Sequence, residues 1–326
     1  MKQRSMAGRH HTGKLRIVAL LLALLIVSIA IASCKSDDKV KTIGILQLVQ
    51  HESLDAAREG FIEGLKSAGY EDGKNIKINY QNASGDQANL KSMAERLVRE
   101  SDLLLAITTP AAQTVVNLEP KIPVLFAAVT DPVGAGLVET MEKPGKNVTG
   151  ASDMAPLDKQ IELLLSVKPM ETIGLLYNSG EANSVVQIEE AKRLLEAAGK
   201  DIVEMAVTTT NDVAQITQNL VARVDGVYIP TDNMIASTAA TVGEILKEAK
   251  IPSVHGSVEQ VENGGLCTIG INYKHNGQLA AEKAVQILKG GKASEIAVSV
   301  DTDTTLVVNE DMAAALGIDP ASIKLP

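Results

Sequence analysis

The sequence predicts an α/β protein with two lobes, each a parallel sheet flanked by helices. Short apolar runs alternate with segments of helical periodicity along most of the chain, which is typical of parallel strands joined by crossover helices. There are about ten such runs, more than one ordinary sheet with short connections accommodates, so two sheets are expected. An internal repeat also supports two lobes.

In each copy of the repeat, an aspartate opens a strand and a threonine follows the end of that strand. A helix comes next, and then a second strand that begins with Ile-Pro. The copies cover residues 102–129 and 225–258. The repeat predicts that the equivalent strand ends at Thr109 and Thr231 lie on opposite walls of one cleft.

The first half of the chain contains four apolar runs that predict strands, at residues 42–49, 75–80, 103–107 and 124–128. The amphipathic segments between these runs predict helices at residues 54–68, 86–99 and 111–118. Asp86 is expected to cap the second helix, because an aspartate oxygen can accept the free amides of a first helical turn.

The pattern resumes after a stretch rich in glycine and proline around residues 144–150. The strands expected in this part are 172–177, 202–207, 226–229, 252–255 and 266–271. The helices expected in this part are 156–167, 182–198, 213–222, 234–249 and 276–288.

The N-terminal segment has the layout of a secretory signal. Basic residues and no acidic residue precede an uncharged run over 17–33, which leads to Ile31-Ala32-Ser33-Cys34. The end of this run resembles a bacterial lipobox, whose cysteine receives acyl chains such as palmitate and becomes the mature N-terminus. Residues 1–33 are therefore expected to be a lipoprotein signal peptide and 34–41 a lipidated tether. An uncleaved transmembrane anchor is the alternative, because the run approaches the minimum length of a span.

Composition excludes several other classes of protein. The formal net charge is −9, and the part after residue 33 is more acidic because the leader carries only basic charges. This negative charge argues against binding to nucleic acid or to anionic lipid. Only Cys34 and Cys267 are present, so lipidation of Cys34 leaves no disulfide, and Cys267 is expected to be a buried, inert thiol.

Polar residues follow three predicted strands, in Thr108-Thr109-Pro110, Thr130-Asp131-Pro132 and Thr231-Asp232-Asn233. Ligands of open parallel sheets bind outside these carboxyl ends. The Thr109 hydroxyl and the amides of Ala111 and Ala112 would suit a carboxylate, since helix N-termini favour anions. Asp232 would pair with an ammonium, so that together the groups match an amino acid. For each single site, ordinary helix capping is the alternative.

Two further segments would face the same cleft. Residues 178–184 form a polar turn that opens a helix, and they are expected to lie on the second lobe. Gln47, Leu48 and Val49 end the first predicted strand. They could line the pocket for the ligand's side chain, although a buried strand end is an equally natural role.

The sequence contains no pattern that indicates an enzyme. It lacks a glycine-rich phosphate loop and a serine nucleophile elbow. His51, His255 and His275 are widely spaced and have no cysteine or glutamate at metal-ligand intervals. We therefore expect neither catalysis nor a cofactor nor a metal.

A series of motifs runs in order over residues 41–326: Ile43-Gly-Ile, HESLDAAREG at 51–60, Asn82-Ala-Ser-Gly-Asp86, Thr109-Pro-Ala-Ala-Gln113, Ala128-Val-Thr-Asp-Pro132, Asn147-Val-Thr-Gly150, Tyr177-Asn, Glu181-Ala-Asn-Ser184 and Pro230-Thr-Asp-Asn233. These motifs resemble the substrate-binding lipoproteins of ABC importers, specifically the tryptophan/tyrosine-type family. The resemblance implies a two-lobed type I periplasmic-binding-protein fold with three crossovers between the lobes and no catalysis. It also implies a permease and an ATPase as partners.

The resemblance further implies how the ligand is held. Thr109, Ala111 and Ala112 would bind the carboxylate. The candidates for binding the ligand ammonium are Asp131, which follows Thr130, and Asp232. Asn183 and Ser184 would contact the ligand from the second lobe.

We therefore expect a monomeric, lipid-anchored binding protein on the outer face of the cytoplasmic membrane, taking an aromatic or large apolar amino acid. Lobe 1 would comprise 42–150 and about 273–298, and lobe 2 would comprise 151–272 and about 299–326. Closure would occur about hinges near 149–153, 270–273 and 298–302. A lipid-anchored sensor or binding subunit for a peptide or sugar, with no transporter, is the alternative.

Overall fold

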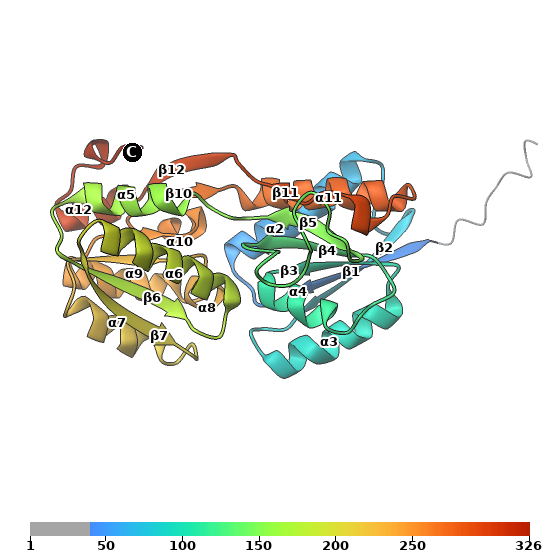
Figure 1. Ribbon diagram of the computed structural model, residues 1–326, viewed down its shortest axis with the longest axis horizontal. Helices are drawn as coiled ribbons and strands as arrows, with labels where there is room; N and C mark the ends of the chain where they lie inside the picture. The colour runs from blue at the N-terminus through green and yellow to red at the C-terminus, as the bar shows by residue number, and fades with distance from the viewer. Residues whose placement is uncertain (1–39) are drawn as a thin grey trace, which may run out of the picture. The chain divides into compact units, whose positions relative to one another are not determined.

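The structure, a computed structural model, describes residues 40–326. The predicted signal peptide and Cys34 lie outside the described residues. Two six-stranded sheets organise the described chain, and each has helices on both of its faces (Figure 1). The predicted α/β class, with two sheets that are mainly parallel, is confirmed.

We call the first sheet and its helices the first lobe. Its strands follow the order β11-β5-β4-β3-β1-β2. Their bounds are β1 (Lys41–Gln47), β2 (Ile76–Asn82), β3 (Leu103–Ile107), β4 (Val124–Val129), β5 (Val148–Ser152) and β11 (Ser299–Val300). The helices are α2 (Glu52–Ser67), α3 (Gln87–Glu100), α4 (Thr109–Val116), α11 (Tyr273–Leu288) and the 3₁₀ helix η1 (Ala293–Glu295).

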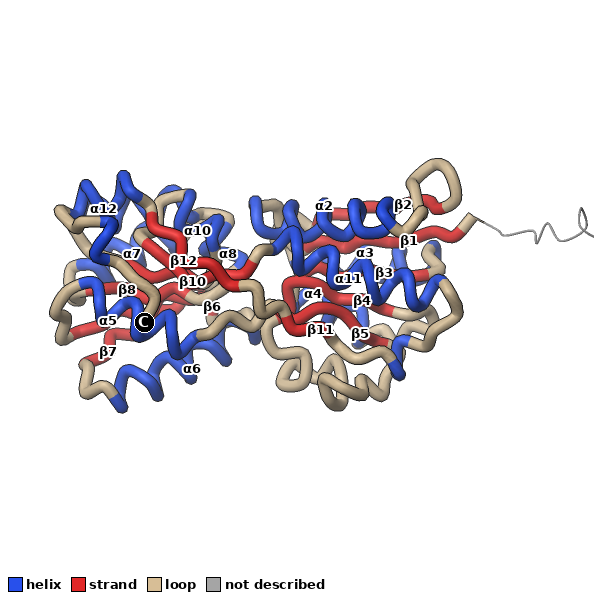
Figure 2. The backbone as a smooth tube through the Cα atoms, turned by 90° about the horizontal axis from the view of Figure 1, so that it is seen from above, coloured by secondary structure: helices blue, strands red, loops and turns tan. Residues whose placement is uncertain are grey.

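Alternation along the strands gives the first sheet two apolar faces. Leu103, Leu105 and Ile107 of β3 belong to a core with α2 and α11, which lie side by side over that face (Figure 2). Leu104 and Ala106 of the same strand belong to the opposite core, with α3 and α4. Side chains of a strand point alternately to its two faces, so a continuous apolar run is what a sheet covered on both sides requires.

The second lobe repeats this plan, with strand order β12-β10-β9-β8-β6-β7. Its strands are β6 (Thr172–Asn178), β7 (Asp201–Val207), β8 (Gly226–Ile229), β9 (Ser253–His255), β10 (Cys267–Ile271) and β12 (Thr304–Val308). Its helices are α5 (Leu157–Val167), α6 (Ala182–Ala197), α7 (Val213–Val221), α8 (Asn233–Ala236), α9 (Ala239–Ala249), α10 (Val258–Glu262), α12 (Glu310–Leu316) and the 3₁₀ helix η2 (Pro320–Ser322). β12 pairs antiparallel with β10, whereas the other registered pairs of this sheet are parallel.

The internal repeat corresponds to equivalent positions in the two sheets. β3 and β8 each stand third from the edge strand, which is β2 in one sheet and β7 in the other. Asp102, before β3, accepts the Thr42 amide at 2.8 Å, and Asp225, before β8, accepts the Thr172 amide at 2.9 Å. The aspartate that opens each copy therefore ties its strand to the neighbouring strand.

Strand β5 was not expected, because its sequence VTGAS contains few apolar residues. All five residues are nevertheless buried. The Thr149 hydroxyl donates to the Ile296 carbonyl at 2.7 Å, and the Ser152 hydroxyl donates to the Thr130 carbonyl at 2.9 Å. Gly150 is required because a β-carbon there would overlap with the Phe126 carbonyl. Satisfied hydroxyls and a close backbone approach thus replace apolar side chains in this strand.

The chain passes between the two sheets after β5, after β10 and after β11. Ser299 and Val300, expected at a lobe boundary, pair with β5 in the first sheet, whereas Met312 and Ile323 join the core of the second. None of the helices in the part of the chain that the structure describes has the length and apolar character needed to cross a membrane. Cys267 is buried, as expected, and burial raises the pKa of its thiol to about 12.

His255 gives a prediction for acid stability. It is 1% exposed, and burial lowers its pKa from 6.5 to about 3. The folded protein keeps this imidazole neutral while the unfolded chain takes up a proton. Since the unfolded state binds more protons below pH 6.5, acidification to about pH 4 should lower the free energy of unfolding by about 3 kcal/mol through His255 alone.

Urea denaturation at neutral pH and at about pH 4 measures this effect. It is carried out on the unmodified protein and on a His255→Gln variant. The variant should lose less stability on acidification. His275→Gln is the matched control, because His275 is far more exposed, with 41% of its side chain accessible. The same acid dependence in His255→Gln and the unmodified protein would contradict the prediction.

Candidate ligand-binding site

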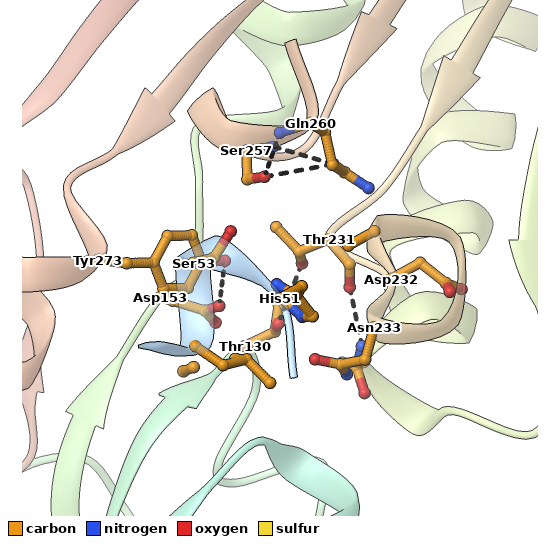
Figure 3. Close-up of a pocket in the computed structure, with 14 residues that line it drawn as sticks. His51, Ser53, Thr130, Asp153, Thr231, Asp232, Asn233, Ser257, Gln260 and Tyr273 are labelled. Atoms are coloured by element: carbon orange, nitrogen blue, oxygen red, sulfur yellow. Dashed lines mark hydrogen bonds between the residues drawn. The ribbon is translucent and has the colours of Figure 1, made fainter. Parts of the chain in front are cut away.

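The candidate site is a cavity at the carboxyl ends of strands from both sheets (Figure 3). We call it the interlobe cavity. The first lobe contributes His51, Ser53, Thr130, Asp153 and Tyr273. The second lobe contributes Asn183, Thr231, Asp232, Asn233, Ser257 and Gln260. Its volume of about 20 Å³ is room for roughly one water molecule.

Asp153 is the acidic group of the first lobe in this cavity. It follows β5 directly and is 3% exposed. Its Oδ2 accepts the Tyr273 hydroxyl at 2.8 Å, whereas Oδ1 has no hydrogen-bond partner within residues 40–326. Burial raises the pKa of Asp153, and nearby Asp301 acts in the same direction. A cationic group beside Oδ1 would therefore stabilise the charged carboxylate.

Asp153 was missed at the sequence level because β5 was not recognised as a strand. The rule that selected Thr130 and Asp232, a polar residue within three positions of the end of a strand, applies equally to Asp153.

Unpartnered polar atoms are concentrated around the cleft. Six buried side-chain atoms of the described chain have no hydrogen-bond partner, and four of them are His51 Nε2, Thr109 Oγ1, Asp153 Oδ1 and Asn183 Oδ1. Most buried polar groups in proteins are hydrogen-bonded, so such a cluster indicates a place where a ligand supplies the partners.

Thr109 lies in a second cavity of about 100 Å³, which we call the side cavity. Asp131 also lines it, and Asn183 lines both cavities. Asp131 Oδ1 accepts the Gly134 amide at 2.8 Å, so this aspartate stabilises the turn after β4. The described side chains that line the two cavities include Asp131, Asp153 and Asp232 but neither lysine nor arginine, which favours a ligand with a cationic group.

Asp232 lines the interlobe cavity, but its carboxylate is already occupied. It caps α8 by accepting the Ile235 amide at 2.9 Å, and it also accepts the Asn178 amide at 2.6 Å and the Ser184 hydroxyl at 2.7 Å. Burial and the nearby Glu181 carboxylate raise the pKa of Asp232 to about 7. Asp232 therefore acts as a helix cap, as the alternative interpretation of the sequence had it. Asp153, which has an unpartnered oxygen, is the better partner for an ammonium.

The start of α4 differs from the expectation. Thr108, not Thr109, is the N-cap: its hydroxyl accepts the Ala111 amide at 3.4 Å, and its carbonyl accepts the Ala112 amide at 3.0 Å. The two amides were expected to be free. The helix itself uses them, because it begins at Thr109, two residues before the predicted start. Ala111 and Ala112 are fully buried and line neither cavity.

The remaining predicted residues also stand behind the cavity walls. Ser184 reaches the site through its bond to Asp232. Gln47 is fully buried, and its Nε2 donates to the Val49 carbonyl at 2.9 Å and to Asp55 Oδ1 at 3.0 Å. Gln47 thus ties the end of β1 to helix α2 and does not line either cavity.

Residues 42–322 match the model of a family described as ABC transporter substrate binding protein. The chain belongs to this family. Its members are extracytoplasmic, bind small molecules such as amino acids, work with ABC permease components and are not themselves enzymes. The resemblance that the sequence motifs indicated is therefore confirmed at the level of the family.

This substrate-binding protein is 40% identical over 291 residues to a tyrosine-binding protein of Clostridioides difficile (strain R20291), covering 88% of this chain and 84% of that protein. A solved structure of an ABC domain in complex with L-Trp from Streptococcus pneumoniae is 39% identical, with a TM-score of 0.83 over 86% of this chain and 96% of that one. A Bacillus halodurans solute-binding protein with bound myo-inositol, 17% identical over 87% of this chain and 99% of that one, has a TM-score of 0.63 and shows the shared fold alone. The fold is the type I periplasmic-binding-protein fold.

A third solved structure differs in conformation. It is the ligand-free, open structure of a substrate-binding protein with adhesive properties from Clostridium difficile, 44% identical over 86% of this chain and 96% of that one. Its TM-score to this substrate-binding protein is 0.66, lower than that of the L-Trp complex despite the higher identity. The described arrangement is therefore nearer to the ligand-bound neighbour than to the open one.

Proposed function

We propose that this substrate-binding protein binds an aromatic amino acid between its lobes and delivers it to the permease of an ABC importer. The observation that carries the proposal is the unpaired Oδ1 of buried Asp153 in a cavity lined by both lobes. A tyrosine-binding relative and the L-Trp complex of a structural neighbour support an aromatic ligand.

The unpartnered atoms suit the two ends of an amino acid. Asp153 Oδ1 and Asn183 Oδ1 are acceptors and would take the ammonium protons. The Thr109 hydroxyl, at the first turn of α4, would donate to the carboxylate. Thr130 and Thr231, whose hydroxyl oxygens lie 3.4 Å apart, would close the cavity from the two lobes.

Binding requires the lobes to part and close again, because a cavity of about 20 Å³ cannot admit an amino acid. Hydrogen bonds between the lobes would hold the closed form. The Ser53 hydroxyl donates to Glu259 Oε2 at 2.8 Å, and Asn263 Nδ2 donates to Glu52 Oε2 at 2.9 Å. The ligand would then favour the closed form by bridging the two walls.

We propose further that Cys34 carries acyl chains and that residues 34–41 tether a monomeric binding protein to the outer face of the membrane. The sequence supports this through the uncharged run and the polar residues that follow Cys34. An ABC permease and its ATPase would be the partners. The lobes would move about the predicted hinges near 149–153, 270–273 and 298–302, where the chain passes between the two sheets.

Thermal unfolding of the full chain, purified in detergent, tests the proposal. We expect tryptophan, tyrosine or both to raise the melting temperature by several degrees, because a ligand at 100 times its Kd adds about 2.7 kcal/mol to the stability of the folded state. Lysine and glutamate are the matched controls and should cause no shift. A folded, ligand-free sample that responds to no aromatic amino acid would contradict the proposal.

A further inference from the structure

Strand β4 is irregular just before it reaches the ligand site. The three steps from Phe126 to Val129 lie opposite only two steps of β5, so β4 holds one extra residue there. Ala128 has a backbone φ of 54°, in the left-handed region that residues other than glycine rarely adopt. Such a bulge changes the direction of the side chains near it. Ala128 and Thr130, which directly follows the strand, both line the interlobe cavity.

A single side chain from helix α11 supports this bulge. Asn276 is fully buried, and its Oδ1 accepts the backbone amide of Ala128 at 3.0 Å. Its Nδ2 donates to the carbonyl of Ser152, the last residue of β5, at 2.9 Å. Because a backbone amide only donates and a carbonyl only accepts, these two bonds fix the orientation of the side chain. Asn276 therefore ties the bulge of β4 to the end of β5.

The same two strand ends carry groups that face the ligand. The Ser152 hydroxyl donates to the Thr130 carbonyl at 2.9 Å, and the Asp153 amide donates to the Val129 carbonyl at 3.1 Å. The ends of β4 and β5 are thus one hydrogen-bonded unit. A shift of either end would move Thr130 and Asp153 together.

Helix α11 reaches this unit through a second side chain. Tyr273 lies three residues before Asn276, on the same side of the helix, and its hydroxyl donates to Asp153 Oδ2 at 2.8 Å (Figure 3). Asp153 Oδ1 is left without a partner among the described residues. Asn276 lines neither cavity, so its effect on a ligand must act through groups that do.

We propose that Asn276 is a positioning residue for the ligand ammonium. By holding the bulge of β4 against the end of β5, it keeps Thr130 and Asp153 Oδ1 directed into the interlobe cavity before the ligand arrives. This inference rests on the proposed function and adds a residue that does not touch the ligand. Because a site arranged in advance loses less conformational freedom on binding, Asn276 should affect the affinity of the folded protein and not only its stability.

Replacement of Asn276 by alanine removes both bonds and gives the first test. Isothermal titration of the full chain with tyrosine and tryptophan, at a temperature where circular dichroism shows the variant to be folded, should give an affinity at least about tenfold lower than that of the unmodified protein. Parental affinity in folded Asn276→Ala would overturn the positioning role and leave the proposed function standing. Binding of neither amino acid by the unmodified protein would overturn both.

Gln160→Ala is the matched control for the loss of a buried amide. Gln160 is also fully buried, and it donates to the Ile269 carbonyl and accepts the Tyr228 hydroxyl, so it links two strands of the second lobe. It lines neither cavity. Gln160→Ala should lose stability but keep the affinity to within about twofold.

Replacement of Ala128 by glycine tests whether Asn276 acts through the bulge. Glycine adopts a φ of 54° without strain, so the bulge needs less support in an Ala128→Gly background. The loss of affinity caused by Asn276→Ala should be at least about threefold smaller in this background than in the unmodified protein. An equal loss in the two backgrounds would overturn the proposal.

A third measurement needs no substitution. In the ligand-free protein, hydrogen exchange followed by NMR should show the Ala128 amide as protected as the amides inside β3. Rapid exchange of the Ala128 amide until tyrosine or tryptophan is added would overturn the proposal even if the variants did not fold, because the arrangement would then form only with the ligand.

Discussion

Replacement of Asp153 by asparagine is expected to weaken binding of the amino acid by at least about 100-fold. The change keeps the shape of the side chain but removes the negative charge beside the unpartnered Oδ1. Loss of one partner from a buried, hydrogen-bonded charge pair costs about 2–5 kcal/mol. Isothermal titration with tyrosine and tryptophan measures the loss.

The folded state should tolerate this change. Burial raises the pKa of Asp153, so the ligand-free protein gains nothing from its charge, and the melting temperature of Asp153→Asn should equal or exceed that of the parent. Asp303→Asn is the matched control, because Asp303 is exposed and near the last crossing between the lobes. Full binding by Asp153→Asn, together with lost binding by Asp131→Asn, would assign the ammonium to Asp131 instead.

The sequence predicted the fold well where side-chain pattern alone decides it. The buried run of β3 (Leu103–Ile107) appeared with the same bounds, and Asp86 caps α3 by accepting the Asn89 amide at 2.7 Å. β5 was not predicted because its hydroxyl groups bind the carbonyls of Ile296 and Thr130, which lie 147 and 22 residues away from their donors in the sequence. No local pattern in the sequence indicates these bonds. Because β5 was not predicted, Asp153, the carboxylate that best fits a ligand ammonium, was not predicted as a site residue either.

The division between capping residues and ligand-binding residues could not be predicted either. Asp232 and Asp153 both follow strands, and nothing nearby in the sequence tells them apart. The difference arises from donors about 50 residues away, since Asn178 and Ser184 occupy one oxygen of Asp232. Whether an oxygen is left for the ligand depends on how the strands and helices pack.

The second large effect is expected at two glycines where helices α2 and α11 cross. A β-carbon on Gly60 would overlap with the carbonyl of Lys274, and one on Gly277 would overlap with the carbonyl of Ala57. Glycine-to-alanine changes inside helices normally stabilise a protein by up to about 1 kcal/mol. Here both Gly60→Ala and Gly277→Ala should instead lower the free energy of unfolding by about 3 kcal/mol, because the backbones must move apart.

Urea denaturation measures the effect, and Ser67→Ala is the matched control, since Ser67 is exposed at the end of α2. The double variant should lose less than the sum of the two single losses, because helices that one alanine has separated leave room for the other. Gly277 lies one helical turn after Tyr273, whose hydroxyl binds Asp153, so its replacement should also weaken ligand binding. Stabilisation by either alanine would show that the crossing is looser than described and that α11 does not fix Tyr273 at the site.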